Sequence, residues 1–215
     1  MIKTKICGLK NIKTIQTAVD AGAHYIGFVF YDKSPRAVTA GLAAELARHI
    51  PTGVKIVGLF VDPEDEELSQ IMSEVPLDMI QLHGAETPER VREIAEMYQM
   101  PIIKAIPVAE ELDIERAYDY RGVADIILFD AKPPKNVVTT LPGGNGIAFD
   151  WEILQDITLP MPWMLSGGLN PYNVDEAIAT CHAQMVDVSS GVENGPGQKD
   201  PELINAFINM VKRCS

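Results

Sequence analysis

The sequence has few cysteines, and none of them is spaced for a metal site or a disulfide framework. Cys7, Cys181 and Cys214 are an odd number, lie far apart and include no CxxC pair. Neither a zinc knuckle nor a set of structural disulfides is therefore predicted, and we expect no metal site. Free thiols suit a reducing compartment, so we expect a cytoplasmic protein.

Positive charge and long hydrophobic runs are also scarce. The chain has 18 Lys and Arg against 30 Asp and Glu, a formal net charge of −12, which argues against nucleic acid or an anionic membrane as a partner. Apolar runs such as 56–61 are far shorter than the roughly 20 residues that span a bilayer. Lysines also interrupt the N-terminal segment before any signal-like stretch. A local positive pocket for a small anion remains compatible with this composition.

What the sequence does contain is a repeated strand-like pattern. Short, apolar, β-rich runs recur at intervals of about 23 residues, enough for one strand, one loop and one three-turn helix. Eight such units predict alternating strands and helices. The runs lie at 3–7, 25–30, 55–61, 78–83, 101–106, 125–130, 162–167 and 185–190.

Helix signals fill the segments between these runs. Apolar residues repeat at helical spacing over 42–50 and 203–211, and Asn11 is placed to cap a helix after the first run. Four further pairs put a capping side chain before a proline, which is typical of a helix start. These pairs are Asp62-Pro63, Thr87-Pro88, Asn170-Pro171 and Asp200-Pro201.

Eight strands allow either a closed (β/α)8 barrel or an open doubly wound sheet. A dinucleotide-binding open sheet would need GxGxxG after the first strand, and the residues there are CGLK. No linker divides the chain, so we expect one (β/α)8 TIM-barrel domain over residues 1–215. The connection 131–148 is the longest irregular stretch.

In such a barrel the active site lies at the carboxyl ends of the strands. The residues that end the runs are therefore the candidates for chemistry. They are Cys7, Phe28, Phe30, Asp62, Gln81, His83, Lys104, Asp130, Ser166, Gly167, Gly168, Asp187, Ser189, Ser190 and Gly191.

Two of these ends are rich in glycine and serine. LSGGLNP (165–171) and VSSGVENGPG (188–197) follow the seventh and eighth runs. Glycine lets backbone N–H groups approach a ligand closely, and this corner of a TIM barrel frequently binds phosphate. We expect a phosphate site here; the alternative is that the glycines only make tight turns.

Cys7 and Asp130 are the candidates for proton transfer. Cys7 is a possible base if its thiolate is stabilised or forms only in the transition state, and otherwise a packing residue. Asp130 ends an apolar run, where a carboxyl group can act as a general acid. The alternative is that Asp130 caps a turn or pairs with Lys132.

Arg36 and His83 are candidates for ligand contacts. Arg36 lies in the loop after the second run, where a guanidinium could bind a carboxylate through two hydrogen bonds; the alternative is a surface arginine. His83 could titrate or only hydrogen-bond a ligand.

Taken together, several segments resemble phosphoribosylanthranilate isomerase of tryptophan biosynthesis. They follow in order over nearly the whole chain, and KICG with the last two segments is specific in combination. A segment at 136–141 lengthens one connection relative to the family pattern. The matching segments are KICGLKN (5–11), GFVFYDKSPR (27–36), QLHG (81–84), LFDAK (128–132), GGNGIAFDW (143–151), LSGGLNPYNV (165–174) and VDVSSGVENGPGQKD (186–200).

The resemblance implies a cofactor-free barrel enzyme that rearranges N-(5-phosphoribosyl)anthranilate to an aminodeoxyribulose phosphate. It implies Cys7 as general base, Asp130 as general acid and Arg36 as the contact for the anthranilate carboxylate. The backbones of Gly167-Gly168 and Ser189-Ser190-Gly191 would bind the phosphate. Asp187 and His83 are weaker candidates for sugar contacts.

Two other hypotheses remain at this point. A related isomerase of histidine biosynthesis would use a pair of aspartates, whereas the first run here ends in Cys7. A non-catalytic phosphate-ligand binder would keep the glycine turns without the chemistry. No exposed apolar stripe requires self-association, so we expect a monomer, with a dimer as the alternative.

Overall fold

The strands form a closed parallel barrel with the strand order β1 to β8. The computed structural model of the chain describes residues 1–132, 143–144, 146 and 149–214, and the segment 136–141 therefore lies outside the described residues. Each strand pairs in parallel with its sequence neighbours, and β8 closes the ring on β1. The strands are β1 (Lys3–Cys7), β2 (Tyr25–Phe30), β3 (Lys55–Phe60), β4 (Met79–Leu82), β5 (Ile102–Val108), β6 (Ile126–Ala131), β7 (Trp163–Leu165) and β8 (Met185–Val188).

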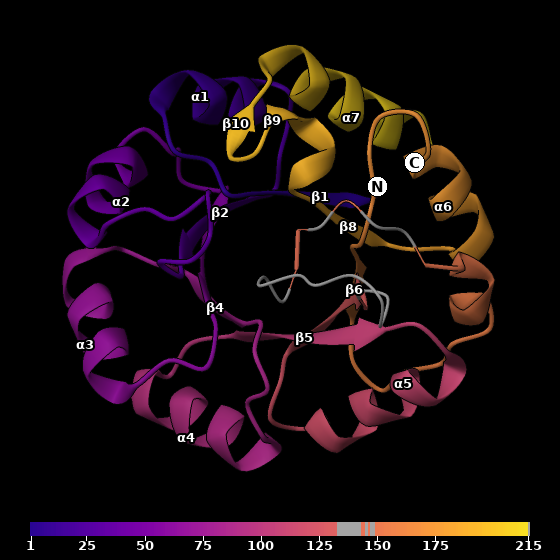
Figure 1. Cartoon of the computed structure of the whole chain (residues 1–215), viewed down its shortest axis with the longest axis horizontal. Coiled ribbons are helices and arrows are strands. Elements are labelled where there is room, and N and C mark those ends of the chain that lie inside the picture. Colours follow the sequence, from indigo (N-terminus) through magenta and orange to yellow (C-terminus); the bar gives the residue numbers. More distant parts are fainter. Residues whose placement is uncertain (133–142, 145, 147–148, 215) are drawn as a thin grey trace.

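The helices surround the barrel as an outer ring (Figure 1). A small hairpin of β9 (Glu193–Gly195) and β10 (Gln198–Lys199) follows β8. The predicted TIM-barrel class is confirmed, because helices and parallel strands alternate around a closed sheet. The helices are α1 (Ile12–Asp20), α2 (Ala40–Ala47), α3 (Asp65–Glu74), α4 (Pro88–Tyr98), α5 (Glu111–Glu115), α6 (Val174–Cys181) and α7 (Pro201–Arg213), with 3-10 turns η1 (Arg116–Tyr120), η2 (Trp151–Leu154) and η3 (Ser190–Val192).

Three of the predicted helix starts are confirmed. Asn11 caps α1 by accepting a hydrogen bond from the backbone of Thr14 at 2.9 Å. Thr87 and Asp200 cap α4 and α7, each with proline at the first helical position. Helix α2 ends at Ala47 and does not continue to residue 50, because proline at position 51 disfavours helical backbone before it.

The other two predicted starts, at Asp62-Pro63 and Asn170-Pro171, are wrong. Helix α3 begins after Glu64 and α6 after Asn173. The Asp62 carboxylate instead accepts from the backbone N–H of Ala85 at 2.7 Å, across to the next loop. Asn170 accepts from the backbone of Tyr172 at 2.8 Å in a local turn, which uses its side chain before a helix can form.

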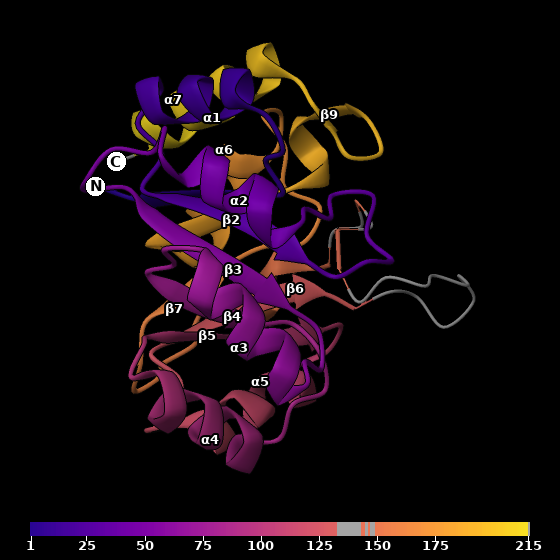
Figure 2. The same ribbon diagram turned by 90° about the vertical axis from the view of Figure 1, so that its left-hand side faces the viewer.

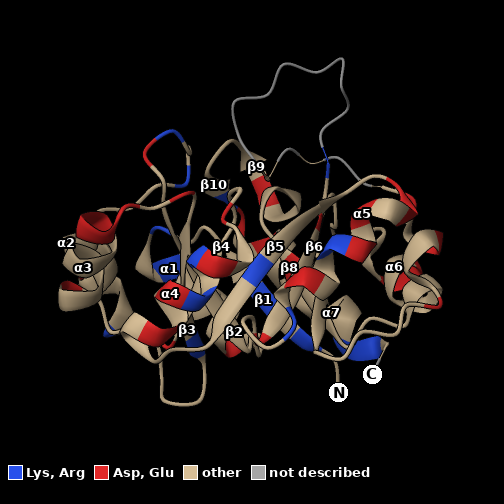
Figure 3. Ribbon diagram, turned by 90° about the horizontal axis from the view of Figure 1, so that it is seen from below, with Lys and Arg blue, Asp and Glu red and all other residues tan. Residues whose placement is uncertain are grey.

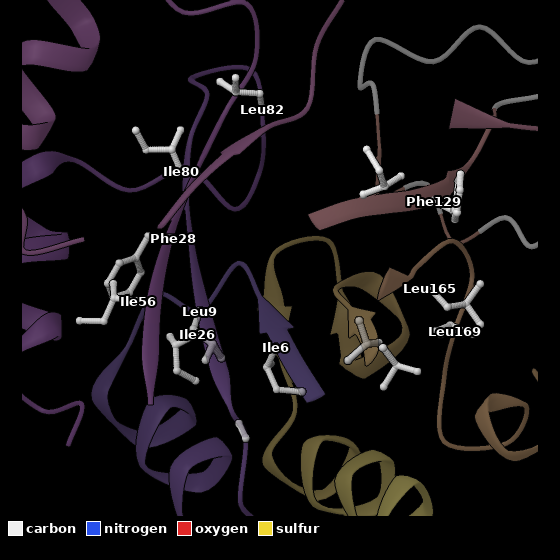
Figure 4. Close-up of a cluster of buried hydrophobic side chains, with 14 of the residues drawn as sticks. Ile6, Leu9, Ile26, Phe28, Ile56, Ile80, Leu82, Phe129, Leu165 and Leu169 are labelled. Atoms are coloured by element: carbon white, nitrogen blue, oxygen red, sulfur yellow. The ribbon is translucent and has the colours of Figure 1, made fainter. Parts of the chain in front are cut away.

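Alternation along each strand divides the core into two parts. Residues such as Ile6, Ile26 and Phe28 point outward and pack under the helices (Figure 4). The inward-facing residues form a second cluster inside the barrel, from Tyr25 and Val57 through Leu128 to Met185. Because parallel strands here are buried on both faces, their sequences read as near-continuous apolar runs.

The same alternation removes three residues from the candidates for chemistry. Phe28 and Phe30 belong to the outer core, and Phe30 stacks on Phe60 there. Lys104 is also buried, and its ammonium binds Glu86 at 2.8 Å. Its neighbours Ile103 and Ala105 are the members of β5 that face the interior. The expectation that these strand-end residues reach the site is therefore wrong.

The two ends of the barrel have different roles. The N- and C-termini lie at one end, and the β9–β10 hairpin lies at the other (Figures 2 and 3). The carboxyl ends of the barrel strands open toward the hairpin, so the loops that follow the strands converge there. Among the described residues, no helix is long and apolar enough to cross a membrane.

Candidate active site

A pocket lies at the carboxyl ends of the strands and is lined by most of the predicted site residues. Gly143 and Gly144 add backbone from the connection after β6, and Val29, Leu59, Val61 and Leu169 supply apolar surface. The predicted residues that line it are Cys7, Arg36, His83, Asp130, Gly167, Gly168, Asp187, Ser189 and Ser190.

Cys7 is held at the end of β1 against a glycine of the neighbouring strand. Gly27 pairs with Cys7 in the sheet, and a Cβ at position 27 would come within 2.9 Å of the Cys7 Sγ. Burial raises the pKa of the Cys7 thiol, and the ammonium groups of Lys5 and Lys199 oppose this while Asp187 adds to it. The surroundings of Cys7 therefore do not lower its thiol pKa, which was one of the two ways in which Cys7 could act as a base.

Beneath Cys7, a buried ion pair joins the neighbouring strands β1 and β8. Lys5 Nζ contacts Asp187 Oδ1 at 2.9 Å, and these residues are register partners on β1 and β8. Burial acts to lower the pKa of Lys5, but Asp187 and Cys7 outweigh it, so the pKa is raised. Ser166 donates to the second oxygen of Asp187 at 3.4 Å. Asp187 thus serves as the counter-charge of Lys5 at the floor of the pocket.

Asp130 faces the pocket from β6 and is bound by His83, which directly follows β4. His83 Nε2 lies 3.1 Å from Asp130 Oδ2, and the backbone N–H of Ala131 donates to Oδ1 at 3.0 Å. Gln81 Nε2 lies 2.9 Å from His83 Nδ1. The alternative pairing of Asp130 with Lys132 is excluded, because Lys132 binds Asp113 at 2.9 Å.

Arg36 is buried, so the surface-arginine alternative is wrong. Its Nε and Nη2 bind the two oxygens of Glu193 at 2.8 and 2.9 Å. Lys199 contacts the same carboxylate at 2.7 Å, and burial lowers the pKa of Lys199 to about 8. Although burial acts to raise the pKa of Glu193, its hydrogen bonds and charge interactions with Arg36 and Lys199 lower it overall. The Nη1 group of Arg36 faces Gly144, where a Cβ would lie within 2.6 Å of it.

The glycine turns after β7 and β8 pack against each other. Gly167 and Gly168 have φ of +85° and +67°, a region that favours glycine. A Cβ on Gly191 would overlap the backbone carbonyl of Leu169, so Gly191 joins the two turns and does not itself line the pocket. Ser189 Oγ donates to the Cys7 carbonyl at 3.2 Å, which fixes this turn to the end of β1.

Comparison with known proteins identifies the family to which this chain belongs. Residues 4–210 match the family model described as N-(5'phosphoribosyl)anthranilate (PRA) isomerase. The chain belongs to the N-(5'-phosphoribosyl)anthranilate isomerase family. It is an aldose–ketose isomerase of tryptophan biosynthesis.

Relatives of the same name match over nearly their full lengths. The N-(5'-phosphoribosyl)anthranilate isomerase of Paracoccus denitrificans is 55% identical over 96% of this chain and 95% of its own. That of Rhodospirillum centenum is 52% identical over 96% of both chains. The crystal structure of phosphoribosyl anthranilate isomerase from Thermotoga maritima is 40% identical, with a TM-score of 0.88 over 99% of this chain and 100% of that one.

A further solved structure is that of a phosphoribosyl anthranilate isomerase in complex with reduced 1-(o-carboxyphenylamino)-1-deoxyribulose 5-phosphate. It is 39% identical, with a TM-score of 0.84 over 99% of this chain and 100% of that one. These likenesses favour this family over a related isomerase of histidine biosynthesis and over a non-catalytic phosphate-ligand binder, because the family model matches residues 4–210.

Sequence reasoning missed two polar residues beside this site. Glu193 and Lys199 lie within the family-like segment 186–200 but had no assigned role, whereas Gln81 was among the strand-end candidates. A possible signal was the excess of charged and amide side chains in segments that are otherwise apolar or glycine-rich. Their partners could not be read from spacing, because Arg36 and Glu193 are 157 residues apart.

Proposed function

We propose that Cys7 is the general base and Asp130 the general acid of the isomerisation. The observation that carries this assignment is that both side chains line one pocket from strands three steps apart around the barrel. A ligand between them would meet a thiol on one side and a carboxyl group on another.

The reaction begins with Asp130 giving its proton to the ring oxygen of the phosphoribosyl group. The C1–O bond breaks, and the anthranilate nitrogen shares its electron pair to form a protonated Schiff base. The Cys7 thiolate then takes the proton from C2, and the C–H electron pair forms the enolamine. This tautomerises to the ketone, with loss of the C2 hydroxyl proton and gain of a proton at C1.

Charge in the pocket controls when Cys7 can act. Burial disfavours the thiolate, whereas Lys5 and Lys199 favour it. The protonated Schiff base adds a further positive charge beside Cys7 only after ring opening. Each proton-transfer group is expected to contribute about 10²- to 10⁴-fold in rate.

The remaining contacts orient the two ends of the substrate. Arg36 would bind the anthranilate carboxylate through Nη1, since Glu193 engages its other edge. The backbones at Gly167-Gly168 and Ser189-Ser190 would bind the phosphate, with Gly191 supporting the turn. His83 and Asp187, the partners of Asp130 and Lys5, would contact the sugar.

Turnover of phosphoribosylanthranilate, followed by anthranilate fluorescence, tests the assignment. We expect Cys7→Ser and Asp130→Asn each to lower kcat by at least about 100-fold. Full kcat in either variant contradicts that residue's role. Retained turnover after EDTA treatment is expected for chemistry that uses only these side chains.

Arg36→Met separates binding from chemistry. Because Arg36 would contact a carboxylate that does not react, we expect KM to rise far more than kcat falls. A fall in kcat with unchanged KM would place Arg36 in the chemical step instead.

We further propose that the chain is one barrel domain over residues 1–215, monomeric and cytoplasmic. Its exposed large apolar residues, such as Ile12, Met97 and Tyr172, are single side chains on different elements. A dimer is the alternative, and one solved structure is described as monomers of the dimeric isomerase from Thermotoga maritima. Light scattering coupled to gel filtration distinguishes the two states.

A further inference from the structure

Three hydrogen-bonded side chains lie in a line that ends at the proposed acid. Gln81 is fully buried on β4, between register partners on β3 and β5. Its amide Nε2 lies 2.9 Å from His83 Nδ1, and His83 Nε2 lies 3.1 Å from Asp130 Oδ2. The line runs from the barrel interior to the pocket, with His83 only 10% exposed.

The direction of these hydrogen bonds places the protons. The structure has Gln81 Nε2 facing Nδ1, and in this orientation the amide can only donate, so the matching tautomer of neutral His83 has its proton on Nε2 and donates it to Asp130. Asp130 accepts at both oxygens, from His83 and from the Ala131 backbone. In this arrangement the His83–Asp130 pair holds one proton, and Asp130 has none to give to a substrate.

An acid-ready Asp130 needs a different arrangement. If Asp130 carries a proton on Oδ2, it donates to His83 Nε2, and the histidine proton must then lie on Nδ1. An Nδ1–H group would face the N–H donors of Gln81, unless the amide turns by 180° and presents its oxygen.

That oxygen has no hydrogen-bond partner in the described structure. Gln81 Oε1 is one of only two buried side-chain polar atoms left unpaired among the described residues. Leaving such an acceptor unpaired costs about 1–3 kcal/mol. The presence of an amide at position 81 is explained if its oxygen accepts a hydrogen bond in a second state of the site. Turning the amide pairs Oε1 with Nδ1–H and satisfies it.

We propose that Gln81 is a positioning residue of a proton relay, in which its amide turns as the His83–Asp130 pair gains or loses a proton. With two protons, the pair exists as imidazolium and carboxylate or, after transfer from Nε2 to Oδ2, as neutral His83 and protonated Asp130. Nδ1–H binds Gln81 Oε1 in both forms. When Asp130 gives its proton to the ring oxygen, neutral His83 keeps Nδ1–H on Gln81 Oε1. Once Nδ1–H is lost to solvent and a proton is taken up at Nε2, Gln81 turns and donates to Nδ1 again.

The surroundings of His83 are consistent with a shared proton. Gly143 lies against His83 Nε2 and Asp130 Oδ2, where a Cβ would overlap both atoms, so this side of the hydrogen bond is covered by backbone. The other charged or titratable groups that line the same pocket are Cys7, Tyr31, Arg36 and Asp187. On the far side of the sheet, Lys104 and Glu86 bind each other and the backbone of the loop that follows β4.

Histidine nitrogen NMR tests the relay without reference to turnover. The chain has four histidines, and a His83→Asn variant assigns the signal. We expect neutral His83 to be the Nε2–H tautomer and to gain Nδ1–H on acidification. The Gln81 side-chain amide signals should change with the same midpoint. If the Gln81 amide signals of the unaltered protein stay constant while His83 titrates, the proposal is overturned.

Two substitutions at position 81 should move that midpoint in opposite directions. Gln81→Glu offers Nδ1–H a permanent charged acceptor, so we expect the midpoint to rise by about 1 unit or more. Gln81→Met has a similar volume and no acceptor, so the midpoint should fall. Movement in the same direction, or none, would contradict the relay.

Kinetics give an independent measurement. We expect Gln81→Met to lower kcat by about 10-fold or more, with KM within about 3-fold, because the loss acts through Asp130. One limb of the kcat–pH profile should shift as the NMR midpoint does. Gln184→Met, at an exposed site where the side chain donates to the His182 carbonyl, is the control and should change neither quantity.

The relay rests on the proposed role of Asp130 as the acid, and the experiments separate the two. If Asp130→Asn keeps full kcat, the acid assignment fails whatever Gln81 does. If Asp130→Asn is inactive and the Gln81 variants keep the wild-type midpoint and kcat, the relay alone is wrong.

Discussion

Cys7 is surrounded by charges that act on its proton in opposite directions. Burial and Asp187 raise the pKa of the thiol, whereas Lys5 and Lys199 lower it. The net result is a pKa above the ordinary value of about 8.5. A thiolate is therefore a minor species in the free enzyme near neutral pH, and its fraction grows as the pH rises.

Removing Lys5 should make that thiolate still harder to form. In Lys5→Met the favourable charge beside Cys7 is lost while Asp187 stays, so we expect the Cys7 pKa to rise further. Thiolate absorbance near 240 nm, taken as the difference from a Cys7→Ser variant, measures it. Asp187→Asn is the matched control and should lower the pKa. A lower pKa in Lys5→Met would contradict this account of the site.

The missing side chain of Gly27 is a second feature of the same corner. A Cβ there would lie 2.9 Å from Cys7 Sγ and 3.1 Å from its Cα. We expect Gly27→Ala to displace the thiol and to lower kcat by about 10- to 100-fold, because a displacement of about 1 Å can cost that much. Gly41→Ala, where a Cβ meets nothing within 4 Å, is the control. Unchanged kcat in Gly27→Ala would show that the thiol position is not critical.

At the scale of elements, a buried ion pair ties three consecutive units together. Glu86 accepts from the backbone of Asp62 at 2.9 Å and from Gly84 at 3.0 Å, and it binds Lys104 of β5 at 2.8 Å. Lys104 also donates to the carbonyls of Leu82 and Gly84. The cluster therefore fixes the loops that follow β3 and β4.

Breaking this pair from one side should be costly. Lys104→Met leaves the Glu86 carboxylate buried without its counter-charge, and we expect a loss of about 3–5 kcal/mol in the free energy of unfolding. The double variant Lys104→Met with Glu86→Gln should recover a substantial part, since it removes the unpaired charge. Urea unfolding measures both. A double variant as unstable as the sum of the single ones would contradict the pairing.

The strands and several helix starts could be predicted from the sequence, because they depend on local patterns. Thr87 and Asp200 succeed as caps, whereas Asp62 fails because Ala85, 23 residues away, uses its carboxylate. Position along a strand identified Cys7 and Asp130. Whether a residue lines the pocket also depends on which face of the sheet its side chain takes. Side chains alternate along β2, so Phe28 packs in the outer core while Val29 faces the pocket. The Arg36–Glu193 pair had no local signature at all.

At the scale of the whole molecule, α7 completes the ring of helices beside α1 (Figure 1). It buries Ile204, Phe207, Ile208 and Val211. Burying such side chains stabilises a fold by about 1.5–3 kcal/mol each. Four of them approach the roughly 5–15 kcal/mol that separates most folded proteins from unfolded ones.

Truncation before Pro201 should therefore abolish cooperative folding of the barrel. We expect the shortened chain to show no urea transition by circular dichroism and no turnover. Phe207→Ala in the full chain is the milder control, with an expected loss of about 3–5 kcal/mol. A truncated chain that unfolds cooperatively would show that the barrel closes without α7.

The close contact between Gly191 and the Leu169 carbonyl has a consequence for redesign of the enzyme. It makes the turns after β7 and β8 a single anchor, already shaped before any ligand arrives. The region around Gly144 and the Arg36 guanidinium is instead built from separate loops that meet there. A library that varies the second region while keeping the anchor intact is therefore the direct route to isomerases for other N-substituted sugar phosphates.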